Sequence, residues 1–171
     1  LKSIVQRTIR VSDALRFETV KDYEDWLSRL RRFGVLMEQT IALLRQGARE
    51  RRVQPKITMQ RVPAQIDKQL VATPEASPFF KPFTKFPDAI PTAEQERIKT
   101  EARAAVKTSI EPAFRDFQKF FTEEYLPACF DEVGAWQLPQ GHDCYAFLAR
   151  RFTTRLKNSS GSARLVFPSC D

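Results

Sequence analysis

The sequence is poor in the residues from which most enzyme active sites are built. It has one histidine, His142, and it contains no H-E-x-x-H, G-x-S-x-G, Walker or G-x-G-x-x-G signature. A catalytic zinc usually needs three protein ligands, and a serine or cysteine nucleophile needs a histidine base within hydrogen-bond reach. Asp143 and Cys144 follow His142 directly, and consecutive helical residues point in different directions, so they form no metal site. From the sequence we therefore predict no catalytic residue and no metal ligand in this chain.

Cysteine is also scarce. Cys129, Cys144 and Cys170 are widely spaced and no C-x-x-C occurs, which excludes a zinc ribbon and a redox pair. Cys129 and Cys144 lie near apolar helical positions, so we expect buried thiols there rather than a disulfide bridge.

Glycine and long apolar runs are scarce too. With 5 Gly, 3 Tyr and few alternating stretches, a sheet-based fold is poorly supported. No run of about 18 apolar residues occurs, so the sequence predicts no membrane span. The hydrophobic share of 42% and the 14 Phe residues indicate a globular body. We expect an all-α fold, a bundle of long kinked helices with an ordered loop rich in Pro and Phe.

The longest helical pattern covers residues 92–130. Thr92 followed by Gln95 is typical of a capping box. Pro112 lies inside the pattern and should kink the helix near Ser109, and Pro127 should end it or bend it again. Steps of three and four place these apolar residues on one face: Ile98, Ala102, Val106, Ile110, Ala113, Phe114, Phe117 and Phe121.

Three shorter helical patterns accompany it. Thr19 can cap a helix that continues as two segments, or as one bent rod, near Gly34. Pro55 fits the first turn of another helix, which Pro63 should kink, and His142 or Asp143 can start the last one. The expected apolar faces are Tyr23, Trp26, Leu27 and Leu30, then Met37, Ile41, Leu44 and Ala48, then Ile57, Val62, Ile66 and Leu70, and finally Tyr145, Leu148, Ala149 and Phe152.

The chain divides into three parts on these patterns. Residues 1–18 are expected to form an irregular lead-in, 19–156 a helical domain that is one half of a larger cleft-forming fold, and 157–171 a flexible tail. Within the domain, residues 74–91 interleave five prolines with Phe79, Phe80, Phe83 and Phe86. We expect these aromatic rings to pin an ordered loop to the core, and a docking segment for a partner is the alternative.

The chain carries a net charge of +7. Basic residues concentrate near the end of the helix expected to carry the second apolar face. They are Arg45, Arg49, Arg51, Arg52 and Lys56. This basic patch is either a cationic helix C-terminus, which the helix dipole favours, or a contact for phosphate or an acidic partner. No aromatic residues interleave for base stacking, so the sequence favours the helix end over a nucleic-acid site.

Four segments carry a resemblance to a known family. They are DYEDWLSRL at 22–30, SPFFKPFTKFP at 77–87, EPAFRDFQKFFTEEYLPAC at 111–129 and LPQGHDCYAFLARRFTT at 138–154. In this order they resemble the bacterial domain-of-unknown-function 885 family (DUF885), over about Phe17 to Leu156. The resemblance implies a large, mostly helical protein similar to the gluzincin zinc metallopeptidases. Members often carry export or lipoprotein signals, so localisation stays open.

The resemblance stops short of the family's chemistry. The zinc-binding H-E-x-x-H-like helix of relatives lies downstream of the matched region, so zinc and a peptide substrate are expected only in full-length relatives. The start at Leu1 without Met, and the departure from the family pattern after Leu156, suggest a truncated, frame-shifted or interrupted copy.

The leading hypothesis from the sequence is a non-catalytic helical fragment that forms one wall of a cleft, with Tyr145 and His142 facing it. Its partner would be the missing C-terminal half or a second copy through self-association. The rival hypothesis is a basic helical module that binds nucleic acid or an acidic partner. A third is an enzyme completed by a partner chain that supplies the zinc helix.

Overall fold

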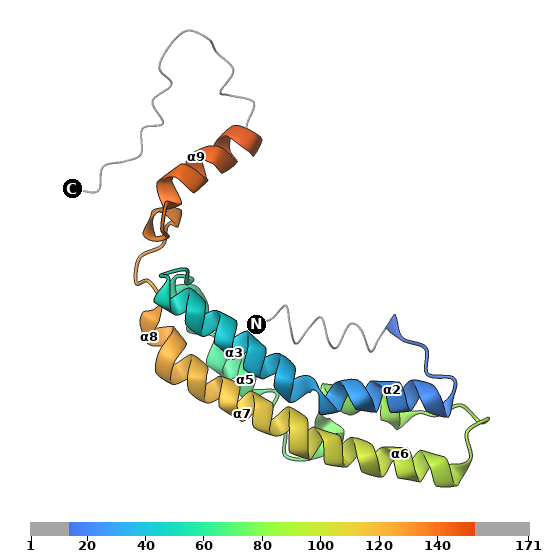
Figure 1. The fold of residues 1–171 in the computed structure, drawn as a ribbon. Coiled ribbons are helices and arrows are strands. Elements are labelled where there is room, and N and C mark those ends of the chain that lie inside the picture. The colour runs from blue at the N-terminus through green and yellow to red at the C-terminus, as the bar shows by residue number, and fades with distance from the viewer. Residues whose placement is uncertain (1–13, 153–171) are drawn as a thin grey trace.

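The structure is a computed structural model that describes residues 14–152, and within this range it is all-α. Two long bent rods lie side by side and run in the same direction (Figure 1). The first rod consists of α2 (Val20–Arg31) and α3 (Phe33–Arg49). The second is continuous through α6 (Thr92–Ala105), η3 (Val106–Ile110), α7 (Glu111–Phe120), η4 (Phe121–Tyr125) and α8 (Leu126–Ala128). The expected fold class is confirmed for this part of the chain, where the β-structure is an isolated bridge between Pro55 and Phe130.

The remaining elements connect the end of the first rod to the start of the second, and then extend the chain beyond the end of the second rod. The return runs through α4 (Lys56–Met59), α5 (Val62–Asp67), η1 (Pro74–Ala76) and η2 (Pro78–Thr84). On the way α4 packs on α8, α5 on α7, and η2 on α6 and α2. After the second rod come η5 (Ala135–Gln137) and α9 (Gly141–Phe152). The expected tail, 157–171, and the expected lead-in up to residue 13 lie outside the described residues.

The first rod begins at a capping box, as Thr19 predicts. The Asp22 amide donates to Thr19 Oγ1 over 3.4 Å, and Asp22 Oδ2 accepts from the Thr19 amide over 2.8 Å. Hydrogen bonds from the hydroxyl and amide of Thr19 lower the pKa of Asp22. The rod then breaks at Arg32, two residues before Gly34, which confirms the expected bend.

Two π-helical turns bend the second rod, and each lies the same distance before a proline. Proline donates no amide hydrogen and its ring crowds the carbonyl four residues back. At η3 the Glu111 amide bonds to the Val106 carbonyl, five residues back, and Pro112 follows. At η4 the Leu126 amide bonds to the Phe121 carbonyl, and Pro127 follows. Widening the turn moves the crowded carbonyl away, so each predicted bend takes the form of a π-turn.

The apolar face predicted for the second rod is buried along its whole length. Every residue named on that face has an exposed fraction of 6% or less. The first rod covers it with Tyr23, Trp26, Leu27, Leu30 and Met37, all at 1% or less. At the bend, the Phe33 ring lies 5.2 Å from Phe79 and 5.4 Å from Phe114, so the two rods and the return segment meet there.

Three local predictions are wrong. Thr92 does not cap α6: Pro91 occupies the N-cap position, and the Gln95 side chain donates instead to the Ile90 carbonyl over 2.8 Å. Ile57 is 60% exposed, because α4 and α5 are separate short helices with different faces. Cys144 is exposed on α9, whereas Cys129 is buried as expected and burial raises the pKa of its thiol.

The segment rich in Pro and Phe docks on the core. Phe79, Phe80 and Phe83 have exposed fractions of 1%, 3% and 0%, while Phe86 is half-buried and stacks on Tyr23 at 4.6 Å. Proline-compatible 3-10 turns, η1 and η2, form the segment, and the Ser77 hydroxyl accepts from the Phe79 amide. This confirms the ordered loop and leaves little aromatic surface there for a partner.

Phe83→Ala should lower the free energy of unfolding by about 3 kcal/mol or more, because it opens a cavity at a fully buried position. Urea denaturation measures the change. The half-buried Phe86→Ala is the matched control and should cost distinctly less. Equal, small losses for both variants would show that the loop is not docked.

Candidate functional site

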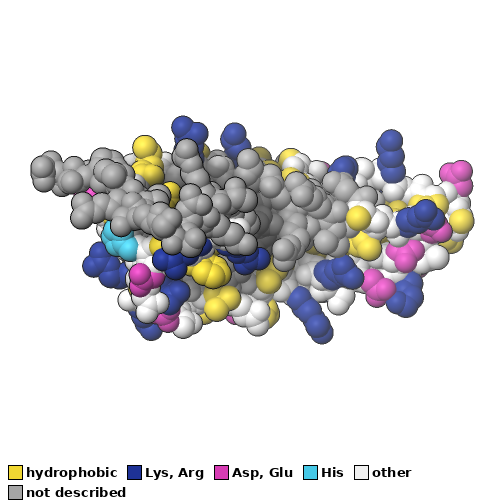
Figure 2. Space-filling model, turned by 90° about the horizontal axis from the view of Figure 1, so that it is seen from above, with side chains coloured by type: hydrophobic (Ala, Val, Ile, Leu, Met, Phe, Trp, Pro, Cys, Tyr) yellow, Lys and Arg dark blue, Asp and Glu magenta, His cyan; other side chains and the backbone are white. Residues whose placement is uncertain are grey.

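The two residues predicted to face a cleft, His142 and Tyr145, lie on α9. His142 is the second residue of this helix, and Tyr145, one turn further along, is 46% exposed. The single histidine also lies at the surface in Figure 2. The structure thus brings both residues to one exposed helix.

An arm formed by η5 and α9 carries these residues away from the rods. Figure 1 shows α9 projecting beyond the ends of α3 and α8. The two arm elements pack on each other, and Gly141 makes this packing feasible, because an added Cβ would lie 1.8 Å from the Ala135 carbonyl oxygen. The sequence predicted one apolar face on this helix, and Leu148 on that face is 42% exposed.

The basic patch lies where α3 ends, and several of its residues form ion pairs with carboxylates of the same chain. Arg45 donates two hydrogen bonds of 2.6 Å to Glu124 on the second rod, from Nε to Oε2 and from Nη2 to Oε1. Its guanidinium also lies 5.2 Å from the centre of the Phe120 ring. Arg52 pairs with Glu50 at 3.3 Å.

The other members of the basic patch close the end of the helix. Arg51 adopts a left-handed φ of 55°, its amide bonds to the Ala48 carbonyl, and the Arg52 amide bonds to the Gly47 carbonyl. This is the Schellman pattern, which usually places glycine where Arg51 stands. The Arg51 guanidinium lies 5.6 Å from the centre of the Phe130 ring, and Lys56 pairs with Asp131 at 3.4 Å. The geometry matches the helix-end interpretation, and Figure 2 shows basic and acidic side chains interspersed on the visible described surface.

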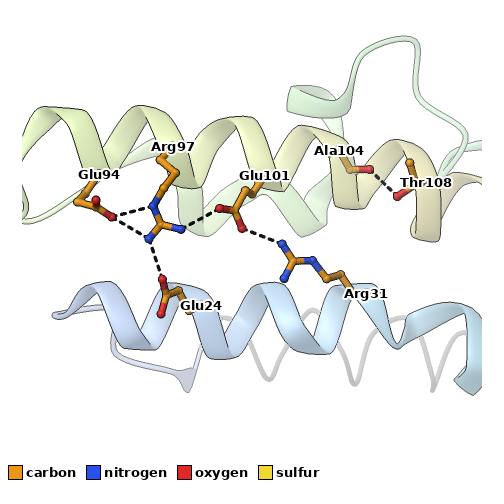
Figure 3. Close-up of polar contacts among 7 residues, drawn as sticks. All are labelled: Glu24, Arg31, Glu94, Arg97, Glu101, Ala104 and Thr108. Atoms are coloured by element: carbon orange, nitrogen blue, oxygen red, sulfur yellow. Dashed lines mark hydrogen bonds and ion pairs between the residues drawn. The ribbon is translucent and has the colours of Figure 1, made fainter.

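A second group of ion pairs joins the rods at their other end (Figure 3). Arg97 on α6 bonds to Glu94 and Glu101 of its own helix and reaches Glu24 on α2 at 2.7 Å. Arg31 of α2 bonds to Glu101 at 2.7 Å. Burial opposes ionisation of Glu101, but the hydrogen bonds from Arg31 and Arg97 outweigh it and lower its pKa. The two pairs between the rods, Arg31 with Glu101 and Arg97 with Glu24, join residues 70 and 73 positions apart, so no local spacing in the sequence could reveal them.

Residues 14–152 contain no group of three His, Cys, Asp or Glu side chains that could hold a metal ion, so they do not fit a zinc site. No helix in the same range is long and apolar enough to cross a membrane. The described chain thus consists of two packed helical rods and an arm that carries both apolar and charged exposed residues.

Comparisons with known proteins show the family and a similar fold. A model of the family described as "Bacterial protein of unknown function (DUF885)" matches residues 1–159, and the chain belongs to this family. The crystal structure of a "putative lipoprotein" from Colwellia psychrerythraea is similar, with a TM-score of 0.71 and 24% identity. The match covers 79% of this chain and 23% of that one, so this chain spans about a quarter of its relative's length. No curated protein matches significantly.

Glu124→Gln should destabilise the fold near neutral pH and have less effect in acid. The hydrogen bonds from Arg45 lower the pKa of Glu124 below its ordinary value of 4.5. The stabilisation from this pair is therefore complete above pH 4.5 and is lost as the pH falls through the lower folded-state pKa. Urea denaturation of both proteins at several pH values tests this.

The neighbouring Glu123→Gln is the control, because Glu123 is exposed and makes none of these contacts. It should change stability little at any pH. A difference between wild type and Glu124→Gln that does not shrink on acidification would contradict the assigned role of the ion pair.

Proposed function

We propose that this chain is a non-catalytic helical part of a DUF885 protein that scaffolds one wall of a cleft in a fold resembling zinc metallopeptidases. The observation that carries the proposal is the arm, on which Trp136, Phe147 and Leu148 are 49%, 60% and 42% exposed. Such a surface is typical of a part that packs against a larger body. The relative's fold, of which this region matches 23%, supplies a body of the required size.

The proposal assigns separate roles to the rods and the arm. The rods provide the support. They bend at the same level, and the ion pairs of Arg97 and Arg45 join them near their two ends. The arm carries Tyr145 and His142 at its exposed side, where they would line the cleft. In this arrangement the metal and the peptide chemistry belong to the remainder of an intact family member, and the residues described here supply shape.

Elemental analysis should find no stoichiometric zinc in the purified chain, and a peptide library should show no chelator-sensitive cleavage. Hydrolysis by a zinc enzyme needs a metal-activated water and a carboxylate to take its proton, and residues 14–152 hold no group of side chains that could bind such a metal. About one zinc per chain, lost in His142→Ala, would overturn the non-catalytic role.

The intact relative from Colwellia psychrerythraea is the reference for the same two measurements. Zinc bound to the relative but not to this chain would support both parts of the proposal. Zinc bound to neither protein would overturn the resemblance to a zinc metallopeptidase. It would not affect the scaffold role, which is argued from the arm.

The rival hypothesis, a basic module for nucleic acid, is tested through salt dependence. Because Arg45, Arg52 and Lys56 already pair with carboxylates, binding to duplex DNA should be weak and should fade steeply as salt rises. Fluorescence anisotropy at several salt concentrations measures it. Tight binding at physiological salt that drops when Arg49, Arg51 and Arg52 are replaced by Ala would favour the module instead.

A further inference from the structure

The side chain of Gln69 holds a buried oxygen atom, Oε1, that accepts no hydrogen bond from the described residues. The buried indole of Trp26, by contrast, donates to the Phe79 carbonyl over 3.4 Å. A buried acceptor without a donor costs free energy, so folded proteins nearly always supply one from the chain, from water or from a ligand. The donor for Gln69 therefore comes from outside the described chain.

Gln69 lines a cavity of about 170 Å³ between the return segment and the second rod. A cavity of about 10–15 Å³ already holds one water, and sites for drug-sized ligands measure about 300–1,000 Å³, so this one has room for a small molecule. Most of its wall is apolar and consists of Val71, Pro74, Val106 and Ile110. Waters need two to four polar partners each, so a ligand with an apolar body suits this wall better than a cluster of waters.

Two contacts fix the loop that covers the cavity, one before it in the sequence and one after it. The Gln118 side-chain amide donates to Asp67, and Arg103 Nε donates to Glu75 over 2.5 Å. Gln118 and Arg103 both belong to the second rod, so the loop is tied to the rod at both of its ends. The rod contributes the π-turn η3 to the cavity wall, and π-turns occur frequently at functional sites. The cavity thus belongs to an anchored part of the fold.

Two charged side chains of the second rod, Lys107 and Glu111, also line the cavity. Glu111 pairs with Arg115 on its own helix, and Lys107 is exposed. The oxygen of Gln69 and the carboxylate of Glu111 both favour a positively charged donor, whereas the ammonium of Lys107 favours an anion. A small ligand that carries both charges next to an apolar group meets all of these requirements.

We propose that this cavity binds a free α-amino acid with an aliphatic side chain of about the size of leucine. The ammonium of the ligand donates to Gln69 Oε1, its carboxylate faces Lys107, and its side chain packs on Val106 and Ile110. A residue inside a peptide has neither charge and a terminal residue has one of the two, so the free amino acid uses the polar groups of the cavity most fully. The proposal goes beyond the scaffold role and does not depend on the arm.

Isothermal titration calorimetry of the full chain with L-leucine tests the site. Leucine should bind wild type with a Kd below about 1 mM, in keeping with its small size. Gln69→Leu should raise this Kd about tenfold or more, because the ammonium loses its acceptor. Gln65→Leu is the matched control: Gln65 is exposed on α5 and does not line the cavity, so its variant should bind like wild type. No binding to wild type, or equal binding to Gln69→Leu, overturns the proposal.

The stability of Gln69→Leu without ligand separates a binding role from a structural one. Because Oε1 has no donor within the described chain, its loss should not lower the free energy of unfolding in urea. Leucine should stabilise wild type against urea and leave the variant unchanged. A variant that is clearly less stable than wild type without leucine would show that the free protein already satisfies this oxygen, for example through a bound water, and would overturn the proposal.

Lys107→Met tests the ligand's carboxylate at an exposed position that the fold tolerates. It should weaken leucine about tenfold and leave leucinamide, which lacks the carboxylate, unaffected. Leucinamide and N-acetylleucine represent the first and the last residue of a peptide, and each should bind wild type about tenfold more weakly than leucine does. Equal binding of either compound would show that the cavity takes the end of a peptide, which overturns the proposal of a free amino acid.

Discussion

The fold depends on a constraint that two prolines impose on one long helix. Pro112 and Pro127 have no amide hydrogen for an α-helical hydrogen bond, and each ring crowds the carbonyl four residues back. In each case a π-turn just before the proline makes room for the ring. The first π-turn lies beside the break at Arg32 in the other rod, so both rods bend at the same level and stay in contact. Phe33, Phe79 and Phe114 meet at this point, and the aromatic core is continuous because the bends coincide.

Electrostatic contacts set the register of the rods while burial supplies most of the cohesion. Arg97 and Arg31 join the rods at one end and Arg45 joins them at the other, all through exposed or partly exposed pairs. Pairs of this kind contribute little stability each, but they discriminate between registers because a sliding rod would separate all of them at once. The basic patch is part of this framework: Arg51 and Arg52 end α3, and Arg45 bonds to Glu124 on the second rod.

Much of the fold was predictable from local pattern, and the surfaces were not. The capping box at Thr19, the bend near Gly34 and the buried face from Ile98 to Phe121 follow from spacing and from the chemistry of single residues. Periodicity also placed Tyr145 and Leu148 on one face of a helix, and both residues do lie on α9. It could not show how exposed that face is, with Tyr145 at 46% and Leu148 at 42%, because burial depends on where distant parts of the chain lie. The pairing of Arg45 with Glu124 was hidden for the same reason.

The parallel arrangement of the rods has a consequence for how the protein is made. Parallel neighbours need a long return connection, so the contacts between the rods join residues 70 to 79 positions apart. A ribosome that adds about 5–20 residues per second finishes α2 and α3 several seconds before their partners on the second rod emerge. During that interval Trp26, Leu30 and Met37 have nothing to pack on. The nascent first rod therefore exposes its apolar face until the second rod emerges, and this interval follows directly from the parallel direction of the two rods.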